Sequence, residues 1–168
     1  MSPRAKKIGI GVVVFLILIQ LYRPARNLSN DQTHHISTVY HVPDTVKAIL
    51  KVSCDDCHSN LTVYPWYANV QPVSGWLTHH INEGREELNL SEFTTYSPRR
   101  QNHKMDEIIK MMDEHEMPLA SYTIIHKDAV MTDAQRLALS SWAQGVMDTM
   151  KATYPADSLR MPQRKSRN

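Results

Sequence analysis

Both cysteines of this 168-residue chain lie in one short run, Cys54-Asp55-Asp56-Cys57-His58. A C-x-x-C-H run is typical of a c-type haem attachment site. Two thiols at this spacing can each add to one of the two vinyl groups of a porphyrin, and the histidine that follows can ligate the iron as the proximal ligand. The sequence therefore predicts one covalently attached haem c, held by Cys54 and Cys57, with His58 on the iron. We expect Asp55 and Asp56 to be solvated spacers.

Two other kinds of site use a close pair of cysteines. A redox-active dithiol of the thioredoxin type requires a βαβ pattern around the cysteines, and the sequence lacks that pattern. A cysteine-rich zinc site requires a second cysteine pair, and the chain has only two cysteines. We therefore favour haem attachment over both alternatives.

The elements that must position these residues have helical periodicity, which predicts an all-α fold. A helix that begins at Pro43-Asp44, with Asp44 as N-cap, leads into Cys54. A second helix begins at Pro72. Its apolar stripe holds Val73, Trp76, Leu77, His80, Ile81, Gly84 and Leu88. A third is expected over Asn102 to His115, and the last begins at Thr132 and Gln135, which have capping-box spacing, and buries Leu139, Trp142, Val146 and Met150.

An uncharged apolar run, Ile8 to Tyr22, follows Arg4, Lys6 and Lys7 near the start of the chain. Its 15 residues span about 22 Å as a helix, which is short for the roughly 30 Å hydrocarbon layer of a bilayer. A cleaved signal peptide would end in a small-x-small site, which is missing after the run. We therefore expect an uncleaved transmembrane anchor with the N-terminus in the cytoplasm, and a location in the bacterial inner membrane as a single-pass protein with the haem domain in the periplasm.

These features predict five segments. They are a cytoplasmic basic end (1–7), the anchor in the lipid bilayer (8–22), a linker (23–37), the haem-binding domain (38–152) and a basic, disordered tail (153–168). Asn27 to Leu159 holds 10 basic and 17 acidic residues, a net charge of −7 with histidine neutral. A nucleic-acid partner is therefore excluded, and the acidic surface favours redox partner proteins at the membrane.

The run CysAspAspCysHisSerAsn, followed by TyrProTrpTyr, GlnProValSerGlyTrp, HisIleAsnGluGlyArg and LeuAsnLeuSerGluPhe, resembles the bacterial haem-binding domain family. The resemblance covers roughly Thr38 to Met150 and continues through MetProLeuAlaSerTyr (Met117 to Tyr122), with Leu119 where a second proline is common. It implies a haem c module with a helical, cytochrome c-like fold. The family has no assigned reaction, so the resemblance does not predict one.

The sixth iron ligand is the open question of the site. Met117, with Pro118 in a segment between two helices, resembles the Met-Pro loop of small cytochromes c and is the first candidate. His80 or His79 is the second, and an open or water-filled position is the third. Weaker candidates are His103, His115 and His126, while Met105, Met111 and Met112 are expected in the core.

Side chains that could contact the haem edge complete the candidate set. They are Trp66, Tyr67, Trp76 and Tyr122 as walls of the crevice, and Arg85, Arg99 and Arg100 as propionate partners.

These expectations favour a protein that is not an enzyme, namely a membrane-held electron carrier with one haem and His/Met ligation. A haem-based sensor of gas or redox state, or a peroxidase-like protein with an open sixth site, is the alternative. A third possibility is a structural subunit of a larger membrane complex.

Overall fold

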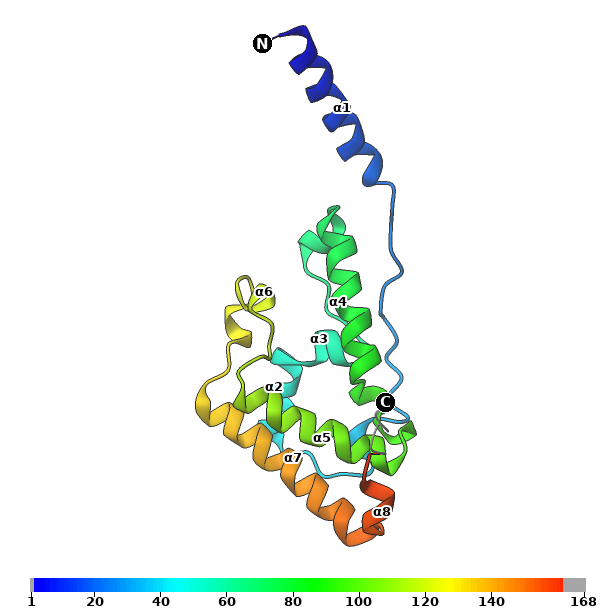
Figure 1. The fold of residues 1–168 in the computed structure, drawn as a ribbon, viewed down its shortest axis with the longest axis vertical. Coiled ribbons are helices and arrows are strands. Elements are labelled where there is room, and N and C mark those ends of the chain that lie inside the picture. Colours follow the sequence, from blue (N-terminus) through cyan, green and yellow to red (C-terminus); the bar gives the residue numbers. More distant parts are fainter. Residues whose placement is uncertain (1, 162–168) are drawn as a thin grey trace, which may run out of the picture.

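A computed structural model describes residues 2–161. Within that range the chain is helical, and its only β pairing is an isolated antiparallel bridge between Leu28 and Leu61. The expected all-α fold is confirmed. The α-helices are α1 (Pro3–Ile19), α2 (Asp44–Ser53), α3 (Asp55–His58), α4 (Val73–Glu87), α5 (Pro98–Asp113), α6 (Ala120–Thr123), α7 (Asp133–Thr153) and α8 (Ala156–Leu159), with 3-10 turns at Ile36–Thr38, Trp66–Asn69, Leu90–Thr95 and Lys127–Ala129 (Figure 1).

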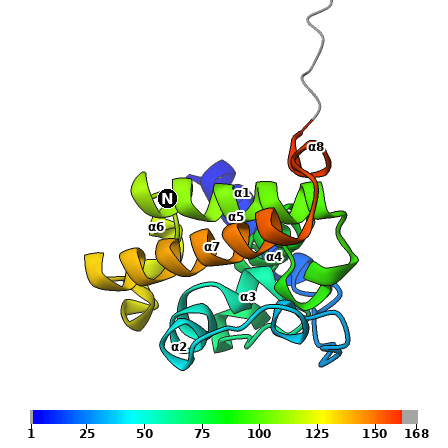
Figure 2. The ribbon, with the colours of Figure 1, turned by 90° about the horizontal axis from the view of Figure 1, so that it is seen from below.

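The helices α5 and α7 form the base of the domain and lie side by side along most of their length (Figure 2). The helix α7 begins where its sequence predicts, because the Thr132 hydroxyl accepts from the Gln135 N–H while the Gln135 side chain accepts from the Thr132 N–H. The expected cap of α2 is wrong. Asp44 is the first helical residue there, and Pro43 precedes it without a side-chain hydrogen bond.

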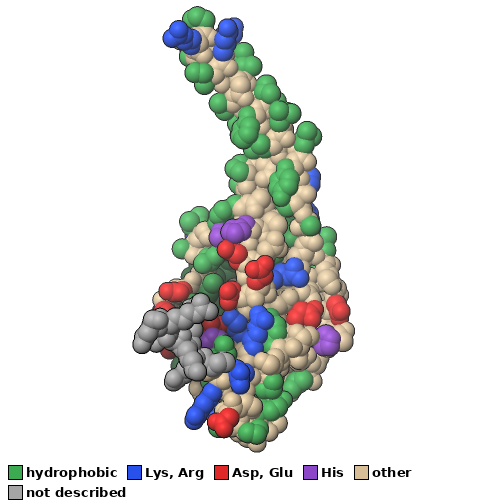
Figure 3. Space-filling model, turned by 45° about the vertical axis from the view of Figure 1, so that its right-hand side comes forward, with side chains coloured by type: hydrophobic (Ala, Val, Ile, Leu, Met, Phe, Trp, Pro, Cys, Tyr) green, Lys and Arg blue, Asp and Glu red, His purple; other side chains and the backbone are tan. Residues whose placement is uncertain are grey.

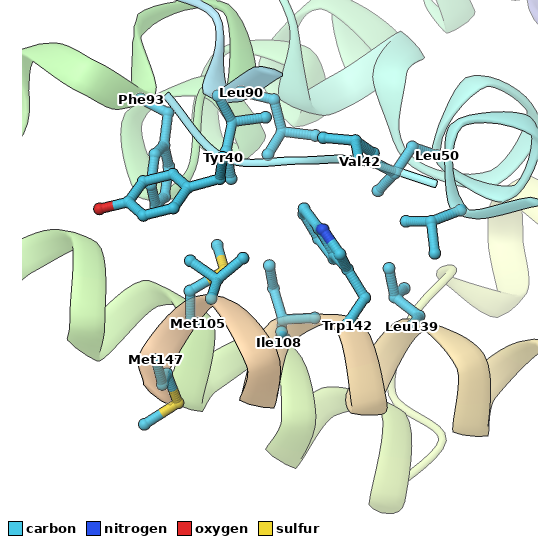
Figure 4. Packing of buried hydrophobic residues seen from close by; sticks show 14 of the residues in the cluster. Tyr40, Val42, Leu50, Leu90, Phe93, Met105, Ile108, Leu139, Trp142 and Met147 are labelled. Carbon is cyan, nitrogen blue, oxygen red and sulfur yellow. The ribbon is translucent and has the colours of Figure 1, made fainter. Parts of the chain in front are cut away.

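The main core cluster fills the space between this base and the segments that cross above it. Trp142 rises from α7 into the centre of the cluster, toward Val42 and Leu50 (Figure 4). Its indole N–H donates to the His41 carbonyl at 3.0 Å, which satisfies the one polar atom that the ring carries into the core. The predicted buried face of α7, including Leu139, is confirmed.

A second, smaller cluster lies between α4 and the turn at Trp66–Asn69. Its buried members are Ala68, Leu77 and Ile81. Cys57 packs against this cluster, whereas Cys54 packs against the main one. The Cys-x-x-Cys-His run therefore lies where the two apolar clusters of the domain meet.

The packed part of the chain is longer than the expected 38–152. Ile36 is fully buried, and Asn27, also buried, donates to the Ser59 carbonyl at 2.8 Å and the Thr62 hydroxyl at 2.9 Å. At the other end Leu159 of α8 is buried in the main cluster, so the packed part of the chain reaches into the expected tail. The rest of the expected tail, 162–168, lies outside the described residues.

The helix α1 projects away from the body of the protein (Figure 1), and hydrophobic side chains lie along the face of it that Figure 3 shows. It begins at Pro3, so it includes the basic residues before the apolar run, and it ends at Ile19. The uncharged helical part, Ile8 to Ile19, is only about 18 Å long. Within residues 2–161, no helix combines the length and the apolar character needed to cross a membrane. The expected single-pass location in the inner membrane, with an anchor at 8–22, is therefore wrong.

Candidate functional site

The Cys-x-x-Cys-His run is positioned by the end of α2 and the single turn α3. Cys54 is the residue between the two helices, and its carbonyl accepts from the N–H groups of Cys57 at 3.1 Å and His58 at 2.9 Å. Residues three and four apart lie on the same side of such a turn. These two hydrogen bonds bring Cys54, Cys57 and His58 together in a single turn of the backbone.

The His58 ring is oriented by a contact with the far end of α4. Its Nδ1 lies 3.0 Å from the Leu88 carbonyl oxygen. A carbonyl only accepts, so Nδ1 must carry the proton and Nε2 must carry the free lone pair. Burial lowers the pKa of His58, and the carbonyl contacts of Leu88 and Gly84 oppose this only in part. The ring is thus neutral at pH 7 and offers Nε2 to a metal.

The helix α4 approaches α3 so closely that only glycine fits at the contact. A Cβ atom at Gly84 would lie 2.8 Å from the Cys57 carbonyl oxygen and 3.1 Å from the Cys57 Cβ. Along the same row of α4, His80 and Trp76 lie one and two turns before Gly84. The sequence placed Gly84 on the α4 stripe, but the contact that requires it is visible only in the structure.

The pKa values of the two thiols are shifted in the opposite direction to those of a redox-active dithiol. Burial, aided by the neighbouring carboxylates, raises the pKa of Cys54 to about 12 and that of Cys57 to about 11. Redox-active Cys-x-x-Cys pairs instead have lowered thiol pKa values. Among residues 2–161, no three His, Cys, Asp or Glu side chains are grouped to hold a metal ion by themselves. The geometry therefore gives no support to the dithiol or zinc alternatives.

The two aspartates within the run are not solvated spacers, contrary to expectation. Burial, with the charge of Asp56, raises the pKa of Asp55 to about 6. Asp56 accepts from the Val63 N–H at 2.9 Å and from the Tyr122 hydroxyl at 2.8 Å. Asp56 thus connects α3 with the loop that follows it and with α6.

A ring stack continues this connection and was not foreseen from the sequence. Tyr122 is stacked on His126, with ring centroids 4.1 Å apart, and His126 Nε2 lies 2.7 Å from the Tyr67 hydroxyl. Tyr67 and Tyr122 were expected near the haem edge, and the structure brings both to His126, with Tyr122 also donating to Asp56 of the Cys54–His58 run. Because the Tyr67 hydroxyl already contacts His126 Nε2, this nitrogen is not available to bind a metal.

Met117, the first candidate for the sixth ligand, lies between α5 and α6. It is partly buried and packs against the main cluster, as Cys54 does. The Arg136 guanidinium donates to its carbonyl at 2.7 Å. Met105 and Met112 are buried in the same cluster and Met111 packs against it, as expected.

His80, the second candidate, has partners on its own helix. Its ring packs edge-to-face on Trp76 with centroids 4.4 Å apart, and its Nδ1 lies 3.5 Å from Glu83. His79 is largely exposed and lies 3.2 Å from the same carboxylate. His103 pairs with Glu107 on α5 at 3.1 Å, where both side chains are partly buried. Of these histidines, His80 is therefore the one on the row of α4 that leads to Cys57.

The arginines that were expected to pair with haem propionates lie in different surroundings. Arg85 donates to the Asn60 side chain at 3.2 Å, close to the haem run, and its Nε is buried without a hydrogen-bond partner among the described residues. Arg100 instead stacks over Tyr96 and donates to the Glu86 carbonyl at 2.9 Å. Trp66 is 79% exposed and does not wall a closed crevice.

These residues fit a haem. Two cysteines and a histidine in one turn, an imidazole that donates through Nδ1, a glycine contact beside them and an apolar cluster next to each cysteine supply what such a group requires. The family model of the haem-binding domain matches residues 14–145. No curated protein and no solved structure matches the chain. The match covers most of the chain, including the whole Cys54–His58 run, and this chain therefore belongs to the haem-binding domain family.

Proposed function

We propose that this protein is an electron carrier with one haem c, covalently held by thioether bonds to Cys54 and Cys57. In this proposal His58 Nε2 is the proximal iron ligand and the Met117 sulfur is the distal one. The bound haem supplies an iron that changes oxidation state by one electron. The chain provides the attachment, the two axial ligands and the apolar surroundings.

The observation that carries the proposal is the hydrogen bond from His58 Nδ1 to the Leu88 carbonyl. An iron-ligating histidine usually donates its other ring N–H to a carbonyl or carboxylate, which fixes the tautomer and makes the ligand more basic. The same contact ties the proximal side to α4, which Gly84 holds against Cys57. The ring is therefore already aimed before the iron is bound, so little reorganisation accompanies a change of oxidation state.

Thioether ligation opposite histidine favours ferrous iron and raises the reduction potential. Met117 is suited to this role because it packs against the same cluster as Cys54, on a loop that is fixed at both ends by α5 and α6. The net negative charge of Asn27 to Leu159 favours docking to a redox partner with a basic surface.

The attachment is tested by expressing the full chain with the cytochrome c maturation machinery and denaturing it. We expect the haem to stay with the wild-type chain and to be lost, wholly or in half of the molecules, from Cys57→Ser. Ser53→Ala is the matched control, because Ser53 lies next to the run and donates only to the Ala129 carbonyl. A Cys54/Cys57 double variant that retains all its covalent haem would overturn the proposal.

The ligation is tested with Met117→Leu, which keeps the side-chain volume and removes the sulfur. We expect loss of the thioether-to-iron band and a lower reduction potential, with the haem still covalently attached. Met111→Leu, a change of the same kind on α5, should leave both unchanged. A wild-type protein whose reduced form binds carbon monoxide at once has an exchangeable sixth site, and this result would favour a sensor or peroxidase-like function instead.

A further inference from the structure

The loop that carries Met117 is held by few backbone contacts. The helix α5 ends with the Glu116 N–H donating to the Met111 carbonyl at 3.1 Å and the His115 N–H to the Met112 carbonyl at 3.3 Å. After this cap, Pro118 has no N–H to offer. In the described part of the chain, the main chain of Met117 and Pro118 makes one hydrogen bond, from Arg136 Nη1 to the Met117 carbonyl oxygen at 2.7 Å.

Arg136 is placed for this contact at some electrostatic cost. It lies at the end of the first turn of α7, where the helix dipole disfavours a positive charge. No carboxylate of residues 2–161 is within ion-pair distance of its guanidinium. Its Nε is buried without a hydrogen-bond partner in the same range. The Met117 carbonyl is therefore the contact that accounts for the position of this cation.

The contact joins the loop between α5 and α6 to a helix that is packed along its length. The helix α7 is fixed at its start by the Thr132 capping box and along its length by the main cluster. A charged donor in partly buried surroundings binds a carbonyl more strongly than a neutral donor does. When Arg136 holds the carbonyl, it holds the orientation of the Met117 peptide and with it the direction in which the side chain leaves the backbone.

We propose that Arg136 is a positioning residue for the sixth iron ligand, which keeps the Met117 sulfur on the iron by holding the Met117 carbonyl from the first turn of α7. This inference rests on the proposed ligation by Met117. Arg136 does not touch the iron or the haem in this proposal and acts only through the loop.

The test compares full-length holoprotein variants by their affinity for imidazole, which binds the oxidised iron when the thioether leaves it. Loss of a charged hydrogen bond should raise the population with an open sixth site on the order of tenfold, and the apparent Kd for imidazole should fall by the same factor. We expect this for Arg136→Gln, with a weaker thioether-to-iron band. Arg136→Lys keeps a charged donor and should restore much of the wild-type affinity.

Two controls separate the possible failures. Arg23→Gln removes an exposed guanidinium that, like that of Arg136, donates to a backbone carbonyl, in this case that of Asn69, and should leave imidazole affinity unchanged. If Arg136→Gln does not fold, Arg136→Met retains the apolar stem without the donors and serves in its place.

Wild-type band and imidazole affinity in the Gln or Met variant, together with loss of the band in Met117→Leu, would overturn this inference and leave the proposed ligation standing. A band that survives Met117→Leu would overturn both.

Discussion

Replacing Gly84 by alanine tests the contact on which the site is built. The new methyl group would lie 2.8 Å from the Cys57 carbonyl oxygen, and that oxygen belongs to the backbone of α3 and cannot rotate away. The helices α3 and α4 must therefore separate. Because α4 also carries the Leu88 carbonyl at its end, the 3.0 Å hydrogen bond of His58 would weaken at the same time.

The size of the effect follows from two opposing terms. Overpacking of this kind costs about 1–3 kcal/mol. Alanine in place of a mid-helix glycine contributes about 0.5–1 kcal/mol of stability. Gly145 in α7 isolates the second term, because a Cβ there would meet nothing within 4 Å. We expect Gly145→Ala to be stabilised by about 0.5–1 kcal/mol and Gly84→Ala to be about 1–3 kcal/mol less stable than Gly145→Ala.

The assay is guanidinium unfolding of both variants and the wild type, followed by far-ultraviolet circular dichroism. The visible spectrum of each holoprotein reports the proximal ligand, and we expect it to change in Gly84→Ala only. If the two alanine variants unfold at the same denaturant concentration with the same slope, the contact between α3 and α4 is not tight and the reasoning fails.

Three further substitutions probe the frame around the site. His115 ends α5 at a positive φ of 57°, so His115→Gly should raise the free energy of unfolding by up to about 1 kcal/mol in spite of the exposed ring contacts it loses; a decrease would contradict this reading of the cap. Thr132→Ala should lower it by about 1 kcal/mol because the hydroxyl no longer accepts from the Gln135 N–H, whereas an unchanged unfolding midpoint would count against the capping box. Burial raises the pKa of Tyr40, whose hydroxyl donates to Gln101 at 2.9 Å, so its contribution to stability is complete below pH 10 and is lost as the pH rises above that value. The free energy of unfolding, measured between pH 8 and 11, should therefore fall less steeply with pH in Tyr40→Phe than in the wild type. Equal slopes would show that Tyr40 does not cause this pH dependence.

The sequence was most informative where the determinants are local. The Cys54–His58 run is contiguous, so a haem site could be predicted from it before any fold was known. The start of α7 was also readable, because a capping box needs only Thr132 and Gln135. The apolar period of α5 and α7 predicted their buried faces for the same reason, since helical spacing alone decides which residues share a face.

Predictions from local sequence were wrong where the end of a helix or a contact with a distant residue mattered. The apolar run from Ile8 suggested a span, but the helix ends at Ile19, and its length is set by where the backbone stops being helical rather than by where hydropathy falls. Asp56 looked like a spacer because its partner Tyr122 lies 66 residues away in sequence. Hydrogen bonds of that separation leave no periodic trace in the chain.

Which residues surround the Cys54–His58 run could be learned only from the tertiary structure. Three contacts depend on how the helices pack: the Leu88 carbonyl orients His58, Gly84 lets α4 approach Cys57, and Arg136 holds the Met117 carbonyl. The sequence by itself determined the helical class of the fold and indicated a haem-binding domain. Only the packing of α3 against α4, and of α7 beside the Met117 loop, decided which residues contact the Cys54–His58 run and Met117, because contact between distant segments depends on the fold and not on spacing along the chain.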